Sequence, residues 1–166
     1  MISKDLVSKA KRVLNACRRQ ALEVATAESC TGGLIAATLT EVAGSSDVVQ
    51  RGYVTYSNAA KIELLGVPEK MIAIHGAVSE IVARAMAEGA RKRARVDIAV
   101  SVTGVAGPGG GTAAKPVGLV HLACARAGRR TLHRRVLLKG NRAAIRRQSV
   151  AIALSMILQQ VGSRRR

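Results

Sequence analysis

The segment Asp97–Thr103, which reads DIAVSVT, constrains the fold more than any other part of the sequence. Its apolar residues occupy both alternating faces, which is typical of a strand buried in the middle of a sheet. Such a strand needs a covering layer on each side, and helices normally supply both layers. The chain has 166 residues, about the length of one domain, and 48% of them are hydrophobic, so it has enough apolar surface for a core of this kind.

Helical and extended patterns alternate along the rest of the chain, with glycine and proline between them. The last two extended segments flank the turn Ala127–Gly128, which predicts a hairpin and at least one antiparallel strand. We therefore expect an α/β fold, a three-layer α/β/α sandwich with a mixed, mainly parallel sheet, in a single domain over residues 1–166 with a disordered basic tail at 163–166. The predicted strands are Glu23–Glu28, Val48–Tyr56, Asp97–Thr103, Val117–Ala125 and Thr131–Leu138, and the predicted helices are Lys4–Gln20, Gly32–Val42, Asn58–Leu65, Glu80–Arg93 and Asn141–Gln160.

The chain is strongly basic, because 27 Lys and Arg against 10 Asp and Glu give a net charge of +17, and no acidic residue follows Asp97. A basic surface favours anionic partners, although a solvated, arginine-rich face explains the same composition. The chain has no Phe or Trp and only two Tyr, so it lacks the aromatic platforms that bind single-stranded nucleic acid. We expect no specific nucleic-acid binding and, without an apolar run of about 20 residues, no membrane partner.

The cysteines and histidines indicate the setting of the protein rather than a metal site. Cys17, Cys30 and Cys124 are widely spaced and include no CxxC pair, which is typical of a protein in the reducing cytoplasm. The three histidines show none of the spacings of metal-binding motifs, so no metal ion is expected.

The first segment that can carry chemistry is Ala27–Gly33, AESCTGG, where a strand gives way to a helix. Two small nucleophiles, Ser29 and Cys30, stand beside the start of that helix. Unpaired backbone N–H groups at a helix start can bind a phosphate or stabilise an oxyanion. The alternative is a tightly packed strand-to-helix turn without a catalytic role.

Lys61 is the second candidate, because it falls in the first turn of a helix that Asn58 is suited to cap. The positive end of the helix dipole and partial burial both disfavour the charged ammonium, so its pKa is expected to fall toward that of a usable general base. Tyr56 is placed to donate a hydrogen bond or to share the proton relay. The alternative is a lysine on the exposed face of an amphipathic helix.

The third candidate is the loop Gly104–Pro116, whose glycines let the backbone approach a ligand closely. Its length of about 13 residues favours a functional loop over a plain connection. As a dinucleotide signature it is weak, because it contains neither GxxxxGK[ST] nor a GxGxxG that opens a helix. Arg142 stands at the start of the last helix, where the dipole and the guanidinium both favour an anion.

Together these segments resemble the CinA C-terminal domain family, whose stand-alone members are nicotinamide-nucleotide amidohydrolases. The resemblance runs from about residue 4 to 160, and its longest stretches are the most specific. The matching stretches are Thr26–Gly33 (TAESCTGG), Gly44–Ser46 (GSS), Arg51–Lys61 (RGYVTYSNAAK), Leu65–Val67 (LGV), His75–Glu80 (HGAVSE), Thr103–Pro108 (TGVAGP), Lys115–Gly118 (KPVG) and Gly140–Arg142 (GNR).

The resemblance implies that the chain converts nicotinamide mononucleotide and water to nicotinate mononucleotide and ammonia, without a cofactor, as a self-associating protein. It places the nucleophile on Ser29, the base on Lys61 and an assisting tyrosine on Tyr56. The usual Gly-Asp-Arg of the family has Asn141 at its centre here, so a role for that carboxylate is lost. The larger members carry an N-terminal nucleotide-pyrophosphatase domain, and that activity is not expected here. The substrate-binding positions are Cys30, Thr31, Gly32, Gly33, Asn58, Thr103, Gly104, Ala106, Gly107 and Arg142.

Three alternatives remain open at this point. Cys30 is a rival nucleophile, because a thiol at a helix N-terminus is activated more readily than a hydroxyl. A non-catalytic nucleotide-binding or regulatory module is a second possibility, which intact Ser29, Tyr56 and Lys61 disfavour. A nucleic-acid-binding protein that uses the basic C-terminal third is a third possibility, and its binding would fall steeply with salt.

Overall fold

The computed structural model describes residues 2–162, so the tail predicted at 163–166 lies outside the described residues. One sheet has the strand order β2-β1-β3-β4-β5. Strand β1 pairs in parallel with β2 and β3, whereas β4 pairs antiparallel with β3 and β5, so within residues 2–162 only β4 runs against the other strands. This confirms the mixed, mainly parallel sheet and its hairpin. The strands are β1 (Val24–Glu28), β2 (Val49–Val54), β3 (Ile98–Gly104), β4 (Leu119–Arg126) and β5 (Leu132–Leu137).

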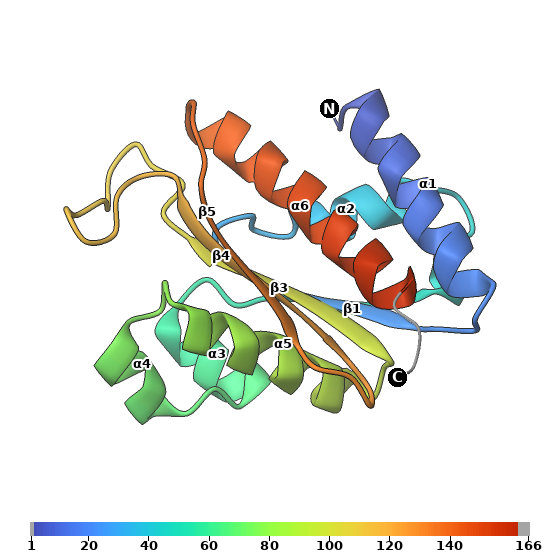
Figure 1. Cartoon of the computed structure of the whole chain (residues 1–166), viewed down its shortest axis with the longest axis horizontal. Helices are drawn as coiled ribbons and strands as arrows, with labels where there is room; N and C mark the ends of the chain where they lie inside the picture. The colour runs from blue at the N-terminus through green and yellow to red at the C-terminus, as the bar shows by residue number, and fades with distance from the viewer. Residues whose placement is uncertain (1, 163–166) are drawn as a thin grey trace.

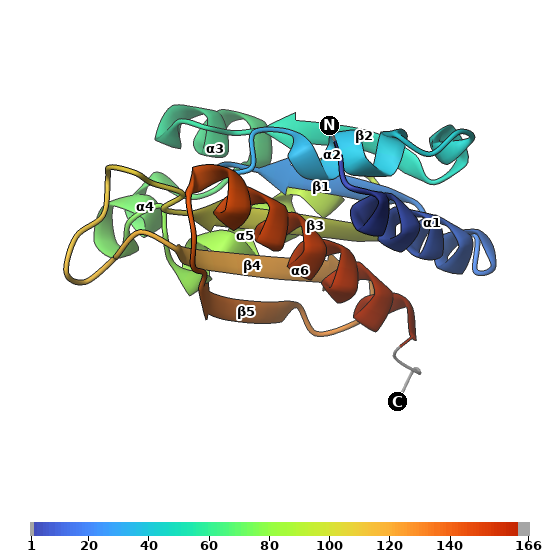
Figure 2. The ribbon, with the colours of Figure 1, turned by 90° about the horizontal axis from the view of Figure 1, so that it is seen from above.

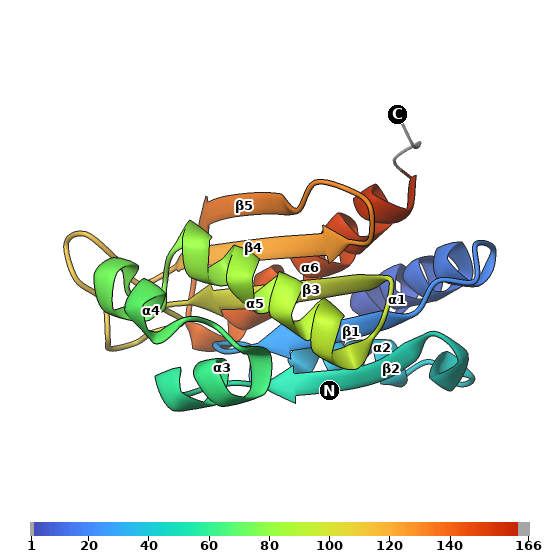
Figure 3. The same cartoon turned by 90° about the horizontal axis from the view of Figure 1, so that it is seen from below.

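Helices cover both faces of this sheet, as the α/β/α class requires (Figure 1). Figure 2 shows α1 (Lys4–Arg18), α2 (Leu34–Thr40) and α6 (Arg142–Gly162) on one face. Figure 3 shows α3 (Asn58–Leu65), α4 (Glu69–His75) and α5 (Glu80–Ala94) on the other. A short 3-10 turn, η1 (Ser45–Asp47), precedes β2. Over the described residues, no helix combines the length and hydrophobicity needed to cross a bilayer.

The core consists of two apolar layers, one on each side of the sheet. Strand β3 is the central strand, and its residues from Ile98 to Thr103 are all buried. Its alternate side chains contribute to different layers, because Val100 packs with the α1, α2 and α6 side whereas Ala99 packs with the α5 side. The DIAVSVT pattern therefore predicts the position of this strand correctly.

The structure confirms two of the three predicted helix N-caps, and the bounds of the five predicted helices differ from the observed ones by at most two residues. Ser79 and Asn141 cap α5 and α6 as predicted, because their side-chain oxygens accept hydrogen bonds from the backbone N–H groups of Val82 (3.3 Å) and Ala144 (2.9 Å). The prediction that Asn58 caps α3 is wrong, because the hydroxyl of Ser57 accepts the bond from Ala60 N and Asn58 begins the helix. Helix α4 is not among the predicted helices; it has only seven residues and no side-chain cap.

Candidate functional site

A cavity of about 310 Å³ opens at the carboxyl ends of β1 and β3, the edge at which sheets of this class bind ligands. The loops that follow β1, β2 and β3 converge there, and the long loop after β3 projects beyond the sheet (Figure 1). Ten of the predicted site residues line this cavity: Ser29, Cys30, Tyr56, Asn58, Lys61, Thr103, Gly104, Ala106, Gly107 and Arg142.

Ser29 and Lys61 meet at the inner wall of this cavity. The backbone N–H of Ser29 donates to Val102 O at 3.0 Å, which ties the residue after β1 to the neighbouring strand. Lys61 reaches it from α3, and its Nζ lies 3.0 Å from Ser29 Oγ. Ser29 is 9% exposed and Lys61 is 1% exposed, so both lie almost out of bulk water.

The surroundings of Lys61 favour its neutral form. Burial removes the ammonium from water and lowers the pKa of Lys61 below the ordinary lysine value of 10.5. The backbone carbonyls of Thr55 and Tyr56 lie 2.8 and 3.4 Å from Nζ and accept its N–H groups. A neutral amine has two N–H groups and one lone pair. With both N–H groups on carbonyls, the lone pair remains for the hydroxyl proton of Ser29.

Cys30 also borders the cavity, but its surroundings do not activate it. Burial raises the pKa of the Cys30 thiol to about 11, so the reactive thiolate is scarce near neutral pH. Its side chain is 6% exposed. The amine of Lys61 contacts the hydroxyl of Ser29 instead. Geometry and pKa therefore both favour Ser29 over Cys30 as the nucleophile.

Glu28 is a site residue that sequence reasoning missed. Its carboxylate is fully buried at the end of β1, directly before Ser29. It accepts hydrogen bonds from the backbone N–H groups of Ile35 (3.0 Å) and Ala36 (2.8 Å) and from the hydroxyls of Thr26 and Thr31. Glu28 ends a strand whose other residues are apolar or Thr, and this pattern predicts a buried carboxylate. A buried Glu needs hydrogen-bond partners, so the sequence does contain a signal that Glu28 has a structural role.

The expectation that the first turn of α2 offers unpaired N–H groups to a ligand is therefore wrong. The carboxylate of Glu28 occupies those of Ile35 and Ala36, because an internal anion is a strong acceptor at a helix N-terminus. Gly32 N and Leu34 N bond within the turn to Ser29 O and Thr31 O. Within residues 2–162, the backbone N–H of Cys30 donates no hydrogen bond to another residue's backbone, and it directly follows Ser29.

Three predicted binding residues, Thr31, Gly32 and Gly33, do not line the cavity. The hydroxyl of Thr31 donates to Glu28 at 2.6 Å, and its carbonyl accepts from Arg146 at 2.7 Å. Gly32 and Gly33 both adopt positive φ, which lets the chain turn from β1 into α2. These residues shape the loop that holds Ser29.

Arg142 also lines the cavity and joins Tyr56 to the loop after β3. Its guanidinium donates to Gly107 O at 2.8 Å and to the hydroxyl of Tyr56 at 2.9 Å. Tyr56 thus contacts Arg142 through its ring hydroxyl and Lys61 through its backbone carbonyl. A cation held at the start of α6 beside a glycine loop is suited to bind a phosphate.

Two glycines let the loop after β3 pack closely against the segment that leads into β4. A Cβ on Gly104 would lie 2.8 Å from Leu119 O, and a Cβ on Gly107 would lie 2.6 Å from Val117. The hydroxyl of Thr103 donates to Ala77 O at 2.9 Å and so fixes the segment before α5 against β3. Five further lining residues are not among the predicted binding positions: Val105, Gly109 and Gly110 belong to the predicted loop Gly104–Pro116, whereas Ala77 and Val78 lie before α5.

A titratable cluster on the α5 side of the sheet also escaped sequence reasoning. His121 on β4 and His133 on β5 stack with ring centroids 5.2 Å apart, and their ring nitrogens lie 3.0 Å apart. Glu80 lies 3.4 Å from the other nitrogen of His133. Among residues 2–162, no three His, Cys, Asp or Glu side chains gather as metal ligands would.

Comparison with known proteins gives a consistent result. The chain is 48% identical over 160 residues to the nicotinamide-nucleotide amidohydrolase PncC of Escherichia coli, with 96% of this chain and 97% of that protein covered. It is 54% identical over 134 residues to a CinA-like protein of a Mycobacterium species, and this match covers 81% of the chain but only 32% of that relative's length. The crystal structure of the competence/damage inducible protein CihA from Agrobacterium tumefaciens matches with a TM-score of 0.94, 48% identity and coverage of 98% of this chain and 99% of that chain.

The family assignment follows from the extent of the match. A model described as the CinA C-terminal domain matches residues 6–161, nearly the whole chain. The chain therefore belongs to the CinA C-terminal domain family.

Proposed function

We propose that this chain is a nicotinamide-nucleotide amidohydrolase, which converts nicotinamide mononucleotide and water to nicotinate mononucleotide and ammonia. The observation that carries the proposal is the 3.0 Å contact between Lys61 Nζ and Ser29 Oγ inside a cavity that Arg142 borders. The 48% identity to PncC, whose name states this activity, supports it over 96% of the chain.

Ser29 and Lys61 carry both halves of the proposed reaction. Ser29 Oγ bonds to the carboxamide carbon of the substrate while its proton passes to the neutral amine of Lys61. The carbon–nitrogen bond then breaks, and Lys61 returns the proton to the departing nitrogen, which leaves as ammonia. Water attacks the resulting ester on Ser29 by the same route, giving the carboxylate and restoring the hydroxyl.

Other residues bind the charges of the substrate. The backbone N–H of Cys30 follows the nucleophile directly, the position from which such groups stabilise the oxyanion of an attacked carbonyl. Arg142 and the glycine loop at Gly104 and Gly107 bind the 5′-phosphate of the nucleotide. We propose that no metal ion or organic cofactor takes part, so turnover is expected to persist after dialysis against a chelator.

Ammonia release from nicotinamide mononucleotide tests the proposal, with Ser29→Ala measured alongside. We expect turnover by wild type and a loss of at least about a thousandfold in Ser29→Ala, because the covalent step disappears. Circular dichroism and thermal melting check that the variant is folded. Equal turnover in both proteins would contradict the proposal. A folded wild type that binds the nucleotide without releasing ammonia would favour the non-catalytic binding module.

We also propose that the protein acts in the cytoplasm as a homo-oligomer of single-domain subunits, in the recycling of pyridine nucleotides. Family resemblance supports the oligomer and the recycling. Three free thiols, at Cys17, Cys30 and Cys124, support a reducing compartment. Sedimentation at several protein concentrations tests self-association, and a single species of monomer mass throughout would contradict it.

A further inference from the structure

A second cavity, of about 390 Å³, lies away from the proposed active site. The last turn of α5, the end of β4 and the turn before β5 enclose it. Five of its lining residues are Arg or Lys and only one is acidic. Its lining residues are Glu88, Arg91, Lys92, Ala125, Arg126, Gly128, Arg129, Arg130 and Thr131, and we call it the basic cavity.

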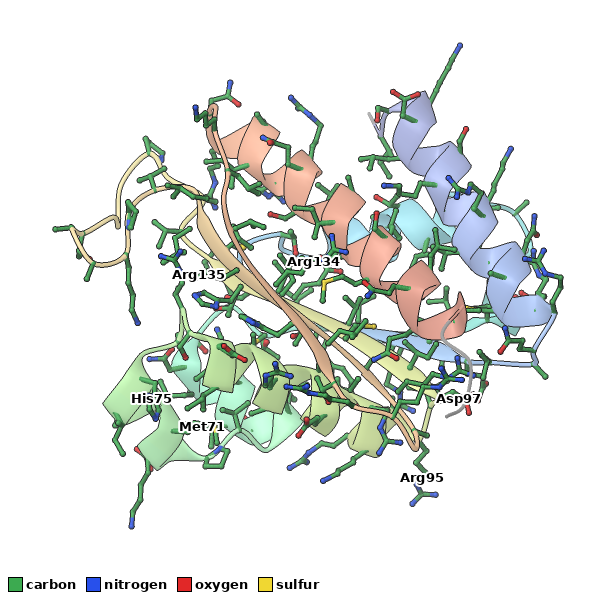
Figure 4. The ribbon with its side chains drawn as sticks, in the orientation of Figure 1. Met71, His75, Arg95, Asp97, Arg134 and Arg135 are labelled. Carbon is green, nitrogen blue, oxygen red and sulfur yellow. The ribbon has the colours of Figure 1, made fainter. Side chains whose placement is uncertain are left out.

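The two cavities lie at opposite ends of the sheet. Gly104, which borders the active-site cavity, ends β3, whereas Ile98 begins β3 and pairs with Arg126 at the basic cavity. The length of the strand separates them by about 20 Å, at about 3.3 Å a residue. Figure 4 shows the two ends of the molecule: His75 is labelled at one end, and Arg95 and Asp97 at the other. A ligand of the basic cavity therefore does not contact the catalytic residues.

The turn that forms one wall of the basic cavity is fixed by hydrogen bonds from neighbouring elements. Gln160, which is 1% exposed, donates to Arg130 O at 3.1 Å. Arg84 donates to Thr131 O, and Arg129 N donates to Arg126 O at 3.1 Å. The turn is therefore organised without a ligand, so binding requires little further ordering.

The positive charge of this cavity exceeds what its own carboxylate can balance. Glu88 accepts a hydrogen bond from the hydroxyl of Thr131 at 2.7 Å. Within residues 2–162, the side chains of Arg91, Lys92 and Arg130 form no ion pair. Cations that converge on one cavity from two elements repel one another, and an anion with several charges relieves that repulsion. Phosphate groups match Arg and Lys both in charge and in hydrogen-bonding geometry.

A neighbouring cavity, also of about 390 Å³, lies on the other flank of α5, beside the end of α3 and the start of α4. The two cavities share Glu88 and Lys92, which are exposed on α5, so they adjoin across that helix, and we call the two together the groove. Pro68 and Met71 supply apolar surface there, and Met71 is labelled on α4 in Figure 4. Its lining residues are Leu65, Gly66, Pro68, Met71, Ala85, Glu88, Gly89, Lys92 and Arg93.

We propose that this groove is a second binding site, for an organic polyphosphate such as a nucleoside triphosphate. The phosphates lie among Arg91, Lys92 and Arg130, and the organic group lies over Pro68 and Met71. The site is independent of the proposed amidohydrolase activity, because none of these residues borders the active-site cavity.

Calorimetric titration at about 150 mM salt tests this site, with ATP and inorganic triphosphate as the two probes. We expect ATP to bind the wild type several-fold more tightly than triphosphate, because only ATP occupies the apolar half. The double variant Lys92→Glu/Arg130→Glu is expected to bind ATP at least tenfold more weakly. Lys4→Glu/Lys11→Glu, exposed positions on α1, changes the net charge equally and is expected to bind as wild type does.

Two further variants and one further ligand distinguish this groove from the active site and from attraction by net charge. Arg142→Ala, at the active-site cavity, is expected to leave ATP binding unchanged, and a loss there would place ATP in the active site and overturn the proposal. Unchanged turnover by Lys92→Glu/Arg130→Glu shows that this variant is folded. Equal weakening in both charge-reversal pairs would indicate attraction by net charge alone and overturn the site. Triphosphate binding as tightly as ATP, or binding of duplex DNA but not ATP, would also overturn it.

Discussion

The side-chain nitrogen of Lys61 lies 3.0 Å from the hydroxyl oxygen of Ser29, although 32 positions separate the two residues in the chain. The contact brings together the loop after β1 and the helix after β2, whose strands are parallel neighbours. Both strands end at the same edge of the sheet, so the segments that follow them meet there. The fold itself thus places the proposed nucleophile, Ser29, beside its proposed base, Lys61.

The pH dependence of turnover is expected to follow Lys61. The amine acts as a base only when neutral, and burial lowers its pKa below 10.5. The value of kcat/KM for ammonia release is therefore expected to rise with pH and to level off above that lowered pKa. Lys61→Arg introduces a guanidinium that stays charged and accepts no proton, so its activity is expected to fall at least about a thousandfold at every pH. A flat wild-type profile, or an active Lys61→Arg, would rule out this role.

Cys30 is expected to be dispensable and slow to react. Its thiol pKa of about 11, against an ordinary 9.0, leaves about a hundredfold less thiolate at pH 8 than an exposed cysteine has. Iodoacetamide is therefore expected to alkylate Cys30 about a hundredfold more slowly than it alkylates a small free thiol, as followed by mass spectrometry. Cys30→Ser is expected to keep ammonia release within about threefold of wild type. Loss of turnover in a folded Cys30→Ser would instead identify the thiol as the nucleophile.

Glu28 is expected to matter for both stability and turnover. Glu28→Gln keeps the shape of the side chain but replaces one carboxylate oxygen with an NH₂ group. This new donor faces the N–H and O–H groups that donate to Glu28, so the free energy of unfolding is expected to fall by about 2–4 kcal/mol. Since the loop after Glu28 carries Ser29, kcat is expected to fall more than KM changes. Urea unfolding and steady-state kinetics measure the two effects. Glu41→Gln, an exposed position at the end of α2, is the matched control and is expected to behave as wild type does.

The stacked histidines are expected to make the fold sensitive to acid. Burial, followed by the charge of His133, lowers the pKa of His121 to about 4 from 6.5. Arg135 and Lys115 lower it further, and Glu80 opposes them. The unfolded chain therefore binds this proton more readily, so stability is lost as pH falls from about 6.5 to 4, by on the order of 3 kcal/mol.

Urea unfolding at pH 4.5, 5.5 and 7 measures this loss. His121→Leu is expected to lose less stability across the range than wild type does. His75→Gln, an exposed position on α4, is expected to follow wild type. If the stability of wild type and of His121→Leu depends on pH in the same way, the stacked pair does not cause the loss of stability in acid.

The sequence predicts those elements whose structure is decided by residues that are close together in the chain. The buried strand Ile98–Gly104 and the caps Ser79 and Asn141 follow from residue type and spacing alone. Helix α4 does not, because it is short and lacks a side-chain cap, and packing of Ile72 into the core supports it.

The candidate site is likewise predicted only in part, because some of its contacts join residues that are far apart in the chain. Sequence reasoning proposed Ser29 and Lys61, and the structure brings them together. It missed Glu28, because the partners of a buried carboxylate come from a helix whose orientation the sequence does not reveal. It also missed the contact between His121 and His133, which depends on the register between β4 and β5.

The guanidinium of Arg142 already has two acceptors within the protein, the carbonyl of Gly107 and the hydroxyl of Tyr56. An incoming group must match those bonds before it can displace them. A phosphate does so, because it exchanges neutral acceptors for charged ones. Free nicotinamide has no anion to offer in exchange. In the proposed reaction, discrimination between a nucleotide and its bare base thus begins as a competition for one arginine, before any bond to the amide forms.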